Sequence, residues 1–202
     1  MRPVRGEERD EVLLALYRKG DVQALSTLVN RYKPRLFAFI LNMSGRYDEA
    51  DDIFQEVWFR AINGLGSYRE KSLLAWLTRI AHNLMIDRWR AAKPTVSLDA
   101  TEDDDRPGLA DKLAVAEPDP ARQAETGDMA RLVMKAVAGL PVEQREVFLM
   151  RVKEDLSFRE IAEIQGVSIN TSLARMQYAL LKLRKVLAGL MSGASKEMAD
   201  EL

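Results

Sequence analysis

The chain has 202 residues, of which 47% are apolar, so it can build one ordinary domain or two small ones with packed cores. The net charge is -1, with no cysteine and a single histidine, His82, which excludes disulfides and zinc sites built on thiolates or several imidazoles. Because no glycine-rich phosphate-binding loop is present either, the sequence predicts no enzymatic activity, no cofactor and no metal.

The first part of the chain has the apolar spacing of helices. Residues 1–10 mix basic and acidic side chains without an apolar core and are therefore not a signal peptide. Asp21 offers a helix N-cap, and Pro34 is expected to bend or interrupt the helix that follows. A second helix is predicted over residues 48–63 and a third over residues 72–93. Their inward-facing stripes are predicted to be Ala50, Ile53, Val57 and Ala61 in the second helix and Leu73, Leu77, Ile80, Ala81 and Leu84 in the third.

Residues 94–127 have the composition of a linker. They contain four of the seven prolines and the acidic run at residues 102–105, and the apolar periodicity lapses there. Residues 97–128 contain ten acidic and three basic side chains, so this stretch carries -7 while the rest of the chain sums to +6. The sequence therefore predicts two domains, residues 1–93 and residues 128–202, joined by a flexible acidic linker.

The second domain is also predicted to be helical, without any period-two strand pattern. Ser157 and Glu160 form a capping box, and Gly166 is suited to end the helix that they begin. Ser168 can cap the next helix, and two helices joined by so short a turn are typical of a helix-turn-helix. The expected helices cover residues 129–138, 142–152, 157–165 and 169 to about 190. The fold class predicted for the whole chain is all-α, with two small helical domains.

Three sequence blocks together resemble a known family. They are EADDIFQEVWFRA at residues 49–61, AWLTRIAHNLMIDRWR at residues 75–90, and the pair LPVEQREVF and LSFREIAE at residues 140–148 and 156–163. In their order and spacing they are similar to bacterial RNA polymerase sigma factors of the sigma-70 family. The short linker resembles the extracytoplasmic-function subgroup, group 4. The resemblance implies a subunit that binds core RNA polymerase, recognises the minus-thirty-five and minus-ten promoter elements and promotes DNA opening.

The resemblance assigns residues 1–93 to the sigma region 2 domain, whose acidic helix docks on core polymerase. Residues 46–62 carry a local charge of -3, and a carboxylate cluster beside an exposed aromatic ring suits an arginine-rich helical partner. The family implies that this partner is the coiled coil of the largest polymerase subunit. Charge alone leaves open an ordinary solvated face with pairs such as Glu56 to Arg60. The expected docking residues are Asp51, Asp52, Gln55, Glu56 and Phe59.

Residues 75–90 resemble the segment that contacts the minus-ten element, and they lie within residues 68–93, which carry a local charge of +4. Arginines neutralise phosphates, an asparagine amide suits the edge of an unstacked base, and Tyr68 is expected to hold that base. The roles of Trp76 and Trp89 stay open between core packing and base stacking. The expected minus-ten DNA-binding residues are Tyr68, Arg69, Arg79, Asn83, Ile86, Asp87 and Arg90.

Residues 128–202 resemble the sigma region 4 domain, whose last helix enters the major groove of the minus-thirty-five element. Arg175 is the first choice for a bidentate contact to guanine, and Tyr178 stands where the family commonly has an arginine. The expected DNA contacts are Ser168, Asn170, Thr171, Ala174, Arg175 and Tyr178. Two buried stripes remain open for this helix, one through Ile169, Leu173, Met176, Leu180 and Leu183, the other through Ser172, Met176, Ala179 and Leu183.

The implied partners are core RNA polymerase, through its largest-subunit coiled coil and its flap, promoter DNA and an anti-sigma factor. The longest purely apolar run, residues 36–41, is far shorter than the roughly 20 residues that span a bilayer, so membrane insertion is not expected. The absence of cysteine favours a reducing, cytoplasmic location.

Two alternative functions stay open at this point, and so does the role of the linker. A stand-alone helix-turn-helix regulator that binds duplex DNA as a dimer would explain the second domain, but it leaves the acidic helix and the basic row of the first without a role. A helical protein that sequesters another regulator is the other interpretation. The linker itself is either a solvated tether or a segment whose negative charge follows the nucleic-acid path through polymerase channels.

Overall fold

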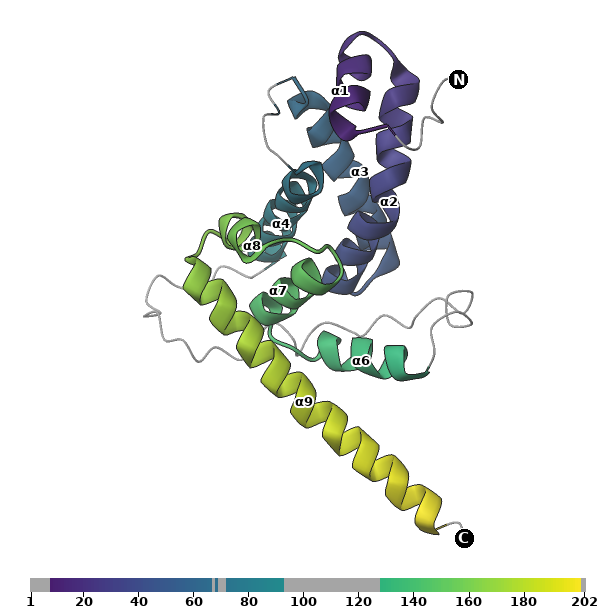
Figure 1. The fold of residues 1–202 in the computed structure, drawn as a ribbon, viewed down its shortest axis with the longest axis vertical. Coiled ribbons are helices and arrows are strands. Elements are labelled where there is room, and N and C mark those ends of the chain that lie inside the picture. The colour runs from purple at the N-terminus through teal and green to yellow at the C-terminus, as the bar shows by residue number, and fades with distance from the viewer. Residues whose placement is uncertain (1–7, 67, 69–71, 93–127, 201–202) are drawn as a thin grey trace. The chain divides into compact units, whose positions relative to one another are not determined.

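Two compact helical units make up the part of the chain that the computed structural model describes, residues 8–66, 68, 72–92 and 128–200 (Figure 1). The first unit contains α1 (Asp10–Arg18), α2 (Val22–Ser44), α3 (Tyr47–Gly64) and α4 (Leu73–Ala92). The second contains α6 (Asp128–Ala138), α7 (Val142–Val152), most of α8 (Phe158–Gln165) and α9 (Ile169–Asp200). All secondary structure in these residues is helical, which confirms the all-α prediction. The predicted linker, residues 94–127, lies outside the described residues.

α2 starts and ends where local chemistry favours it. The Asp21 carboxylate accepts hydrogen bonds from the backbone amides of Gln23 and Ala24 at 3.0 and 3.3 Å, which confirms the predicted N-cap. Gly45 ends the helix with a left-handed φ of +74°, a conformation that costs glycine little. Between these ends α2 continues through Pro34. Of the two expected effects of the proline, a bend or an interruption, the interruption does not occur.

Tertiary packing explains why α2 tolerates the proline, which costs about 3 kcal/mol or more inside a helix. Buried side chains precede and follow Pro34, and α2 packs against α1, α3 and α4. The stripes predicted for α3 and α4 face this core, except that Ile80 is half-buried. The buried side chains include Leu28, Leu36, Phe39, Ile40 and Met43 of α2, Ala50, Ile53, Val57 and Ala61 of α3, and Leu73, Leu77, Ala81 and Leu84 of α4.

α1 is a helix that the apolar pattern did not predict. It packs on α2 and buries two leucines. A polar cluster fastens its start, because the Asp10 carboxylate accepts hydrogen bonds from the Arg31 guanidinium and from the Tyr32 hydroxyl. Arg31 also donates to the backbone carbonyl of Glu8 at 2.6 Å. The start of the described chain is thereby held on α2.

The Tyr32 hydroxyl makes the stability of the first unit sensitive to alkaline pH. Burial, and then the hydrogen bond and the negative charge of Asp10, raise the pKa of Tyr32 well above its ordinary value of 10.0. The folded chain therefore keeps this proton at a pH where the unfolded chain loses it. Its contribution to the free energy of unfolding is constant below about pH 10 and is lost as the pH rises further.

We expect Tyr32→Phe to lower the free energy of unfolding at neutral pH by about 1 kcal/mol, because a hydrogen bond to a carboxylate is lost. Above about pH 10 the difference from the wild type should shrink, since only the wild type loses the contribution of the phenol. Urea denaturation of the full chain at a series of pH values measures both effects. Tyr47→Phe is the control, because that side chain is 59% exposed. A constant difference between wild type and Tyr32→Phe at every pH would contradict the assignment.

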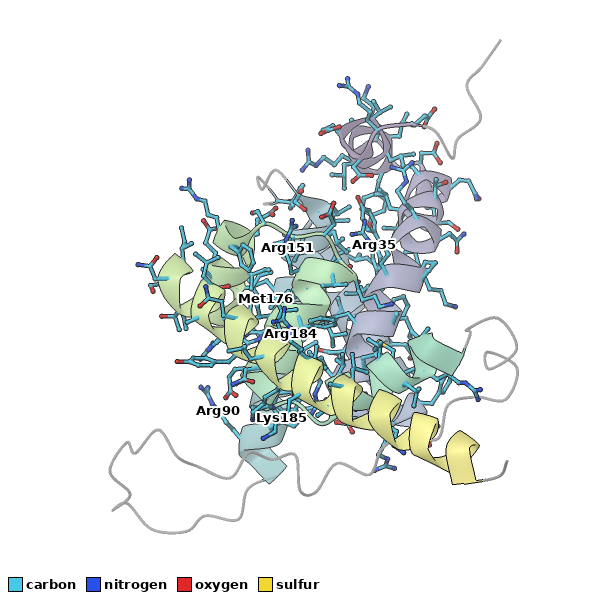
Figure 2. The ribbon with its side chains drawn as sticks, turned by 60° about the horizontal axis from the view of Figure 1, so that its bottom comes forward. Arg35, Arg90, Arg151, Met176, Arg184 and Lys185 are labelled. Atoms are coloured by element: carbon cyan, nitrogen blue, oxygen red, sulfur yellow. The ribbon has the colours of Figure 1, made fainter. Side chains whose placement is uncertain are left out.

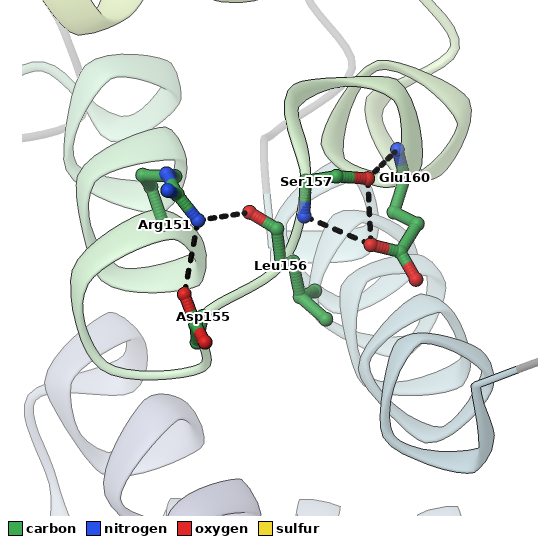
Figure 3. A network of polar contacts seen from close by, with 5 residues as sticks. All are labelled: Arg151, Asp155, Leu156, Ser157 and Glu160. Carbon is green, nitrogen blue, oxygen red and sulfur yellow. Dashed lines mark hydrogen bonds and ion pairs between the residues drawn. The ribbon is translucent and has the colours of Figure 1, made fainter.

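α8 and α9 form the predicted helix-turn-helix. The Ser157 hydroxyl accepts from the Glu160 backbone amide at 3.3 Å, and the Glu160 carboxylate accepts from the Ser157 amide at 2.8 Å (Figure 3). This reciprocal pair is the predicted capping box at the start of α8. Gly166 follows α8 with a left-handed φ of +65°. Ser168 accepts from the Thr171 amide at 3.0 Å at the start of α9, which confirms the second predicted cap.

Arg151 at the end of α7 holds the turn that leads into α8. Its guanidinium donates to the Asp155 carboxylate at 3.0 Å and to the Leu156 carbonyl at 3.2 Å (Figure 3). It also lies 5.8 Å from the centroid of the Phe158 ring, within the range of a cation–π interaction. Asp155 has a φ of 52°, which is uncommon for a residue other than glycine, so these contacts help to fix a strained turn.

The core of the second unit includes one buried arginine. Arg145 is 3% exposed, and its guanidinium donates to the Leu140 carbonyl at 3.2 Å. Burial lowers the pKa of Arg145, because the charged form is poorly solvated there. α9 packs on α6 and α7, and it extends to Asp200, beyond the predicted end near residue 190.

Candidate functional site

An open groove lies between the exposed face of α3 and one side chain of α4. Its volume is about 530 Å³, and the residues that line it are Asp52, Gln55, Glu56 and Phe59 of α3 and Arg88 of α4. Four of the five predicted docking residues therefore line one surface feature, which we call the α3 groove. Phe59 is 64% exposed, although phenylalanine is among the residues most often buried. The α3 groove thus offers a partner both negative charge and an uncovered aromatic ring.

Hydrogen bonds along α3 orient the carboxylates of the α3 groove. The Gln55 amide donates to the Asp51 carboxylate at 2.7 Å, which places the fifth predicted docking residue beside the groove. Arg60 donates to the Glu56 carboxylate at 2.7 Å, so the helix pairing that charge alone left open is present. An exposed pair of this spacing contributes only about 0.3–0.5 kcal/mol. A partner can therefore compete with it at little cost.

α4 presents the predicted minus-ten row on a side away from its buried stripe. Asn83, Asp87 and Arg90 are exposed, whereas Arg79 and Ile86 are half-buried. Steps of three or four residues place them along one face of the helix. Arg90 lies in the last turn of α4 (Figure 2). The structure therefore keeps these two guanidinium groups and the Asn83 amide along one side of α4.

Tyr68 and Trp76 form an aromatic pair ahead of this row. Their ring centroids are 5.0 Å apart with the planes tilted by 51°, and both residues are half-buried. Trp76 also lies against Gly64, where an added Cβ would come within 3.0 Å of the indole. Trp76 therefore has a packing role, and Trp89 is half-buried. Arg69, the neighbour of Tyr68 that was expected to bind DNA, lies outside the described residues.

The first turns of α9 carry the residues expected at the minus-thirty-five element. Asn170, Thr171 and Tyr178 are exposed, and Ala174 and Arg175 are half-buried. Besides capping the helix, the Ser168 hydroxyl lies 2.9 Å from the Thr171 hydroxyl. The capping bonds fix the start of the helix and leave the other side chains to face a ligand.

The structure decides between the two stripes left open for α9. Ser172, Ala179 and Leu183 are 0%, 0% and 5% exposed, so the stripe through Ser172 is the buried one. The stripe through Leu173 is wrong, because Ile169, Leu173 and Leu180 are 47%, 38% and 49% exposed. Met176 belongs to both stripes and is half-buried, and Figure 2 shows it along α9 with Arg184 and Lys185. The side that carries Asn170, Ala174 and Tyr178 therefore lies away from the buried stripe.

Known proteins share both units of this chain. Residues 28–95 match the family described as Sigma-70 region 2, and residues 130–183 match Sigma-70, region 4. The ECF RNA polymerase sigma factor SigW of Bacillus subtilis is 31% identical over 176 residues, which cover 86% of this chain and 94% of SigW. The ECF RNA polymerase sigma factor SigM of Mycobacterium tuberculosis is 32% identical over 194 residues, which cover 95% of this chain and 91% of SigM. The chain belongs to the ECF RNA polymerase sigma factors.

A solved structure shares the fold of this sigma factor. The sigma factor RpoE of Bartonella quintana, in complex with the anti-sigma factor NepR, has a TM-score of 0.60 and 22% sequence identity, covering 81% of this chain and 96% of that one. As a member of its family, the chain is a transcription initiation factor that recognises promoters together with RNA polymerase. This membership removes the interpretations as a stand-alone regulator or a sequestering protein. Within the described residues, no helix combines the length and the apolar character that a bilayer span requires.

Two arginines of the sigma factor occupy positions that sequence patterns did not predict. Arg88 lines the α3 groove although it belongs to α4. Arg18, in the last turn of α1, donates to the Leu65 carbonyl at 3.0 Å, across 47 positions of sequence. Periodicity describes which residues of one helix share a face, but it does not say which residue of another helix will lie beside them. Only the spacing of the leucines in α1 offered a signal, by marking a further amphipathic helix.

Proposed function

We propose that the two units of this sigma factor divide the work of promoter recognition. Residues 1–93 bind core RNA polymerase and recognise and open the minus-ten element, residues 94–127 act as a tether, and residues 128–202 read the minus-thirty-five element. The matches to region 2 over residues 28–95 and to region 4 over residues 130–183 support this division.

The α3 groove binds the arginine-rich coiled coil of the largest polymerase subunit in this proposal. Asp51, Asp52 and Glu56 supply the charge that steers the two surfaces together. Phe59 supplies apolar area at the centre of the contact, where aromatic residues contribute most to affinity. Arg88 limits the negative charge of the groove, so a partner that carries some carboxylates beside its arginines is also accommodated.

α4 and the aromatic pair ahead of it recognise the minus-ten element. Arg79 and Arg90 bind phosphates, Asn83 and Asp87 contact base edges, and Ile86 adds apolar contact along the same face. Tyr68 stacks on an unpaired base, an interaction worth about 1–3 kcal/mol for aromatic side chains and single-stranded bases. Capture of such bases offsets the cost of unstacking them, a few kcal/mol for each flipped nucleotide, so opening requires no ATP.

The exposed side of α9 reads the minus-thirty-five element in the major groove. Arg175 contacts guanine, and Asn170, Ala174 and Tyr178 contact neighbouring positions. Ser168 and Thr171 lie at the N-terminus of α9, where a helix end favours a phosphate, so these hydroxyls fit a backbone contact.

The remaining partners follow from the family. The polymerase flap holds the second unit in place, and an anti-sigma factor regulates the chain, as the complex of the Bartonella quintana sigma factor with NepR suggests. The chain has no catalytic activity of its own and works in the cytoplasm. Its position in the holoenzyme supplies the affinity that an α9 surface of modest positive charge lacks.

The observation that carries the proposal is that the first unit bears a groove for a protein on α3 and a polar row for a nucleic acid on the adjacent α4. A substitution of Asn83 tests the role of the polar row of α4. With promoters mapped by run-off transcription of a genomic library, we expect Asn83→Ala to slow strand opening roughly tenfold, since one base contact is worth about 1–3 kcal/mol. Permanganate reactivity of unpaired thymines measures opening, and a mobility shift measures binding to the closed duplex.

The two measurements separate base capture from general affinity. Binding of the holoenzyme to closed duplex should change less than twofold in Asn83→Ala, because the amide meets its base only after unstacking. Gln55→Ala is a control that also removes one amide, but from the α3 groove, and it should not change permanganate reactivity once the holoenzyme is saturated. Equal loss of duplex binding and of opening by Asn83→Ala would refute the role of Asn83.

A further inference from the structure

One side chain of α1 ties down the segment that follows α3. Nη2 of Arg18 donates to the Leu65 carbonyl at 3.0 Å and, over a longer distance of 3.5 Å, to the Tyr68 carbonyl. The Leu65 carbonyl lies just past the end of α3, where the last carbonyls of a helix lack partners inside the helix. A guanidinium has five donors in a rigid plane and can therefore serve two carbonyls at once. Arg18 supplies these partners from a helix 47 positions earlier in the chain.

Arg18 is itself attached to a fixed element. The Asp10 cluster with Arg31 and Tyr32 holds the start of α1 on α2, and buried leucines hold its middle. At the end of α1, the Lys19 backbone amide donates to the Leu16 carbonyl at 3.0 Å, and the Gly20 amide donates to the Tyr17 carbonyl at 2.8 Å. Because both ends of α1 are secured, the Arg18 backbone is a firm anchor for the guanidinium.

The same segment is held from its other side by α4. The Tyr68 ring packs on Trp76 with the centroids 5.0 Å apart, and Trp76 in turn packs on Gly64 at the end of α3. Arg18 thus fixes the backbone of Tyr68, and Trp76 fixes its ring. Neither contact involves the side chains that form the polar row of α4.

We propose that Arg18 is a positioning residue for recognition of the minus-ten element. It holds the backbone at Leu65 and Tyr68, so that the Tyr68 ring is already in place when an unpaired base arrives. This inference rests on the base-stacking role proposed for Tyr68. A ring that is already ordered binds a base more favourably than one that becomes ordered during binding, because its conformational entropy does not fall further when the base binds.

The test uses holoenzyme assembled from core polymerase and the full chain. A 2-aminopurine placed in the minus-ten element reports base unstacking by its fluorescence. We expect Arg18→Ala to slow opening about three- to tenfold, which is the range for losing an ordinary hydrogen bond at an exposed site. Arg18→Lys should fall between alanine and wild type, since an ammonium can still reach one carbonyl. Lys19→Ala removes the same charge from the adjacent exposed residue and should open like wild type.

A double-mutant cycle with Tyr68→Ala shows whether Arg18 acts through Tyr68. If it does, Arg18→Ala should slow opening in the wild-type background and have almost no effect in the Tyr68→Ala background. Core affinity should be unchanged in Arg18→Ala, and the midpoint of thermal unfolding should stay well above the temperature of the assay, because the side chain is exposed and lies outside the buried core. A drop in either that accounts for the slower opening would overturn the inference in favour of a general structural role.

The remaining outcomes distinguish the inference from the proposed function beneath it. Equal effects of Arg18→Ala in both backgrounds, or wild-type opening by Arg18→Ala, would overturn the positioning role while Tyr68 keeps its own. Wild-type opening by Tyr68→Ala would overturn the stacking role of Tyr68, and the inference about Arg18 with it.

Discussion

Reversing the charge of Asp52 with Asp52→Lys should weaken binding to core RNA polymerase roughly tenfold to a hundredfold. This carboxylate lines the α3 groove together with the exposed Phe59 and with Arg88, so a lysine there adds a second positive charge to the side that must face an arginine-rich partner. Like charges brought together at an interface cost several kcal/mol, and solvent screening reduces that cost at an exposed site. Fluorescence anisotropy of labelled sigma factor titrated with core polymerase measures the change.

The salt dependence of the lost affinity for core polymerase distinguishes the contribution of charge from that of apolar contact. The defect of Asp52→Lys should become smaller as ionic strength rises, because exposed charges are screened within about 8 Å at physiological salt. Phe59→Ala should weaken binding by a similar factor that changes little with salt, since it removes buried apolar area. Glu11→Lys makes the same charge change at an exposed position of α1 and serves as the control. Wild-type affinity in Asp52→Lys at low salt would refute docking through the α3 groove.

The sequence alone predicted the buried face of a helix where only one apolar stripe was present. The α3 stripe of Ala50, Ile53, Val57 and Ala61 is fully buried as predicted, because a single apolar face of that helix can meet a core. The caps at Asp21, Ser157 and Ser168 were equally predictable, since they depend on side chains within three residues of the amides that they bind.

The sequence pattern did not predict features of the helices that depend on tertiary contacts. In α9, polar Ser172 is buried and Leu173 is 38% exposed, because the side that carries Ser172, Ala179 and Leu183 is the one that packs against the neighbouring helices. In α2, buried side chains around Pro34 outweigh the lost backbone hydrogen bond. Composition does not reveal either result, since each depends on what the neighbouring helices supply.

The candidate sites divide in the same way. The residues of the α3 groove that belong to α3 share one helix face, so their spacing predicted that they would lie together. Arg88 and Arg18 belong to other helices than the residues that they contact or adjoin. The hydrogen bond from Arg18 of α1 to the Tyr68 carbonyl joins residues 50 positions apart in the sequence. Such contacts are fixed by how helices pack, which a one-dimensional pattern does not contain.

Arg175→Ala should lower transcription from promoters with the preferred minus-thirty-five element about 5- to 150-fold, because a bidentate contact from arginine to guanine is worth about 1–3 kcal/mol. The buried stripe through Ser172 and Ala179 leaves Arg175 half-buried at the edge of the exposed side of α9, and a half-buried arginine can pack its stem while its charged head stays accessible. Transcription from two templates that differ only in having a preferred or a scrambled minus-thirty-five element gives the ratio of activity between them. On the scrambled template, the variant and the wild type should be nearly equal.

Two further variants separate base reading from charge. Arg175→Lys keeps the positive charge but lacks the planar fork, so it should lose most of the discrimination while keeping affinity for phosphates. Arg184→Ala removes the same side chain nine residues later in α9, which is about two and a half turns on and on roughly the opposite side of the helix. It should leave the ratio between the two templates unchanged. If Arg175→Ala lowers transcription equally from both templates, Arg175 contributes only general affinity or stability, and sequence is read by other residues of α9.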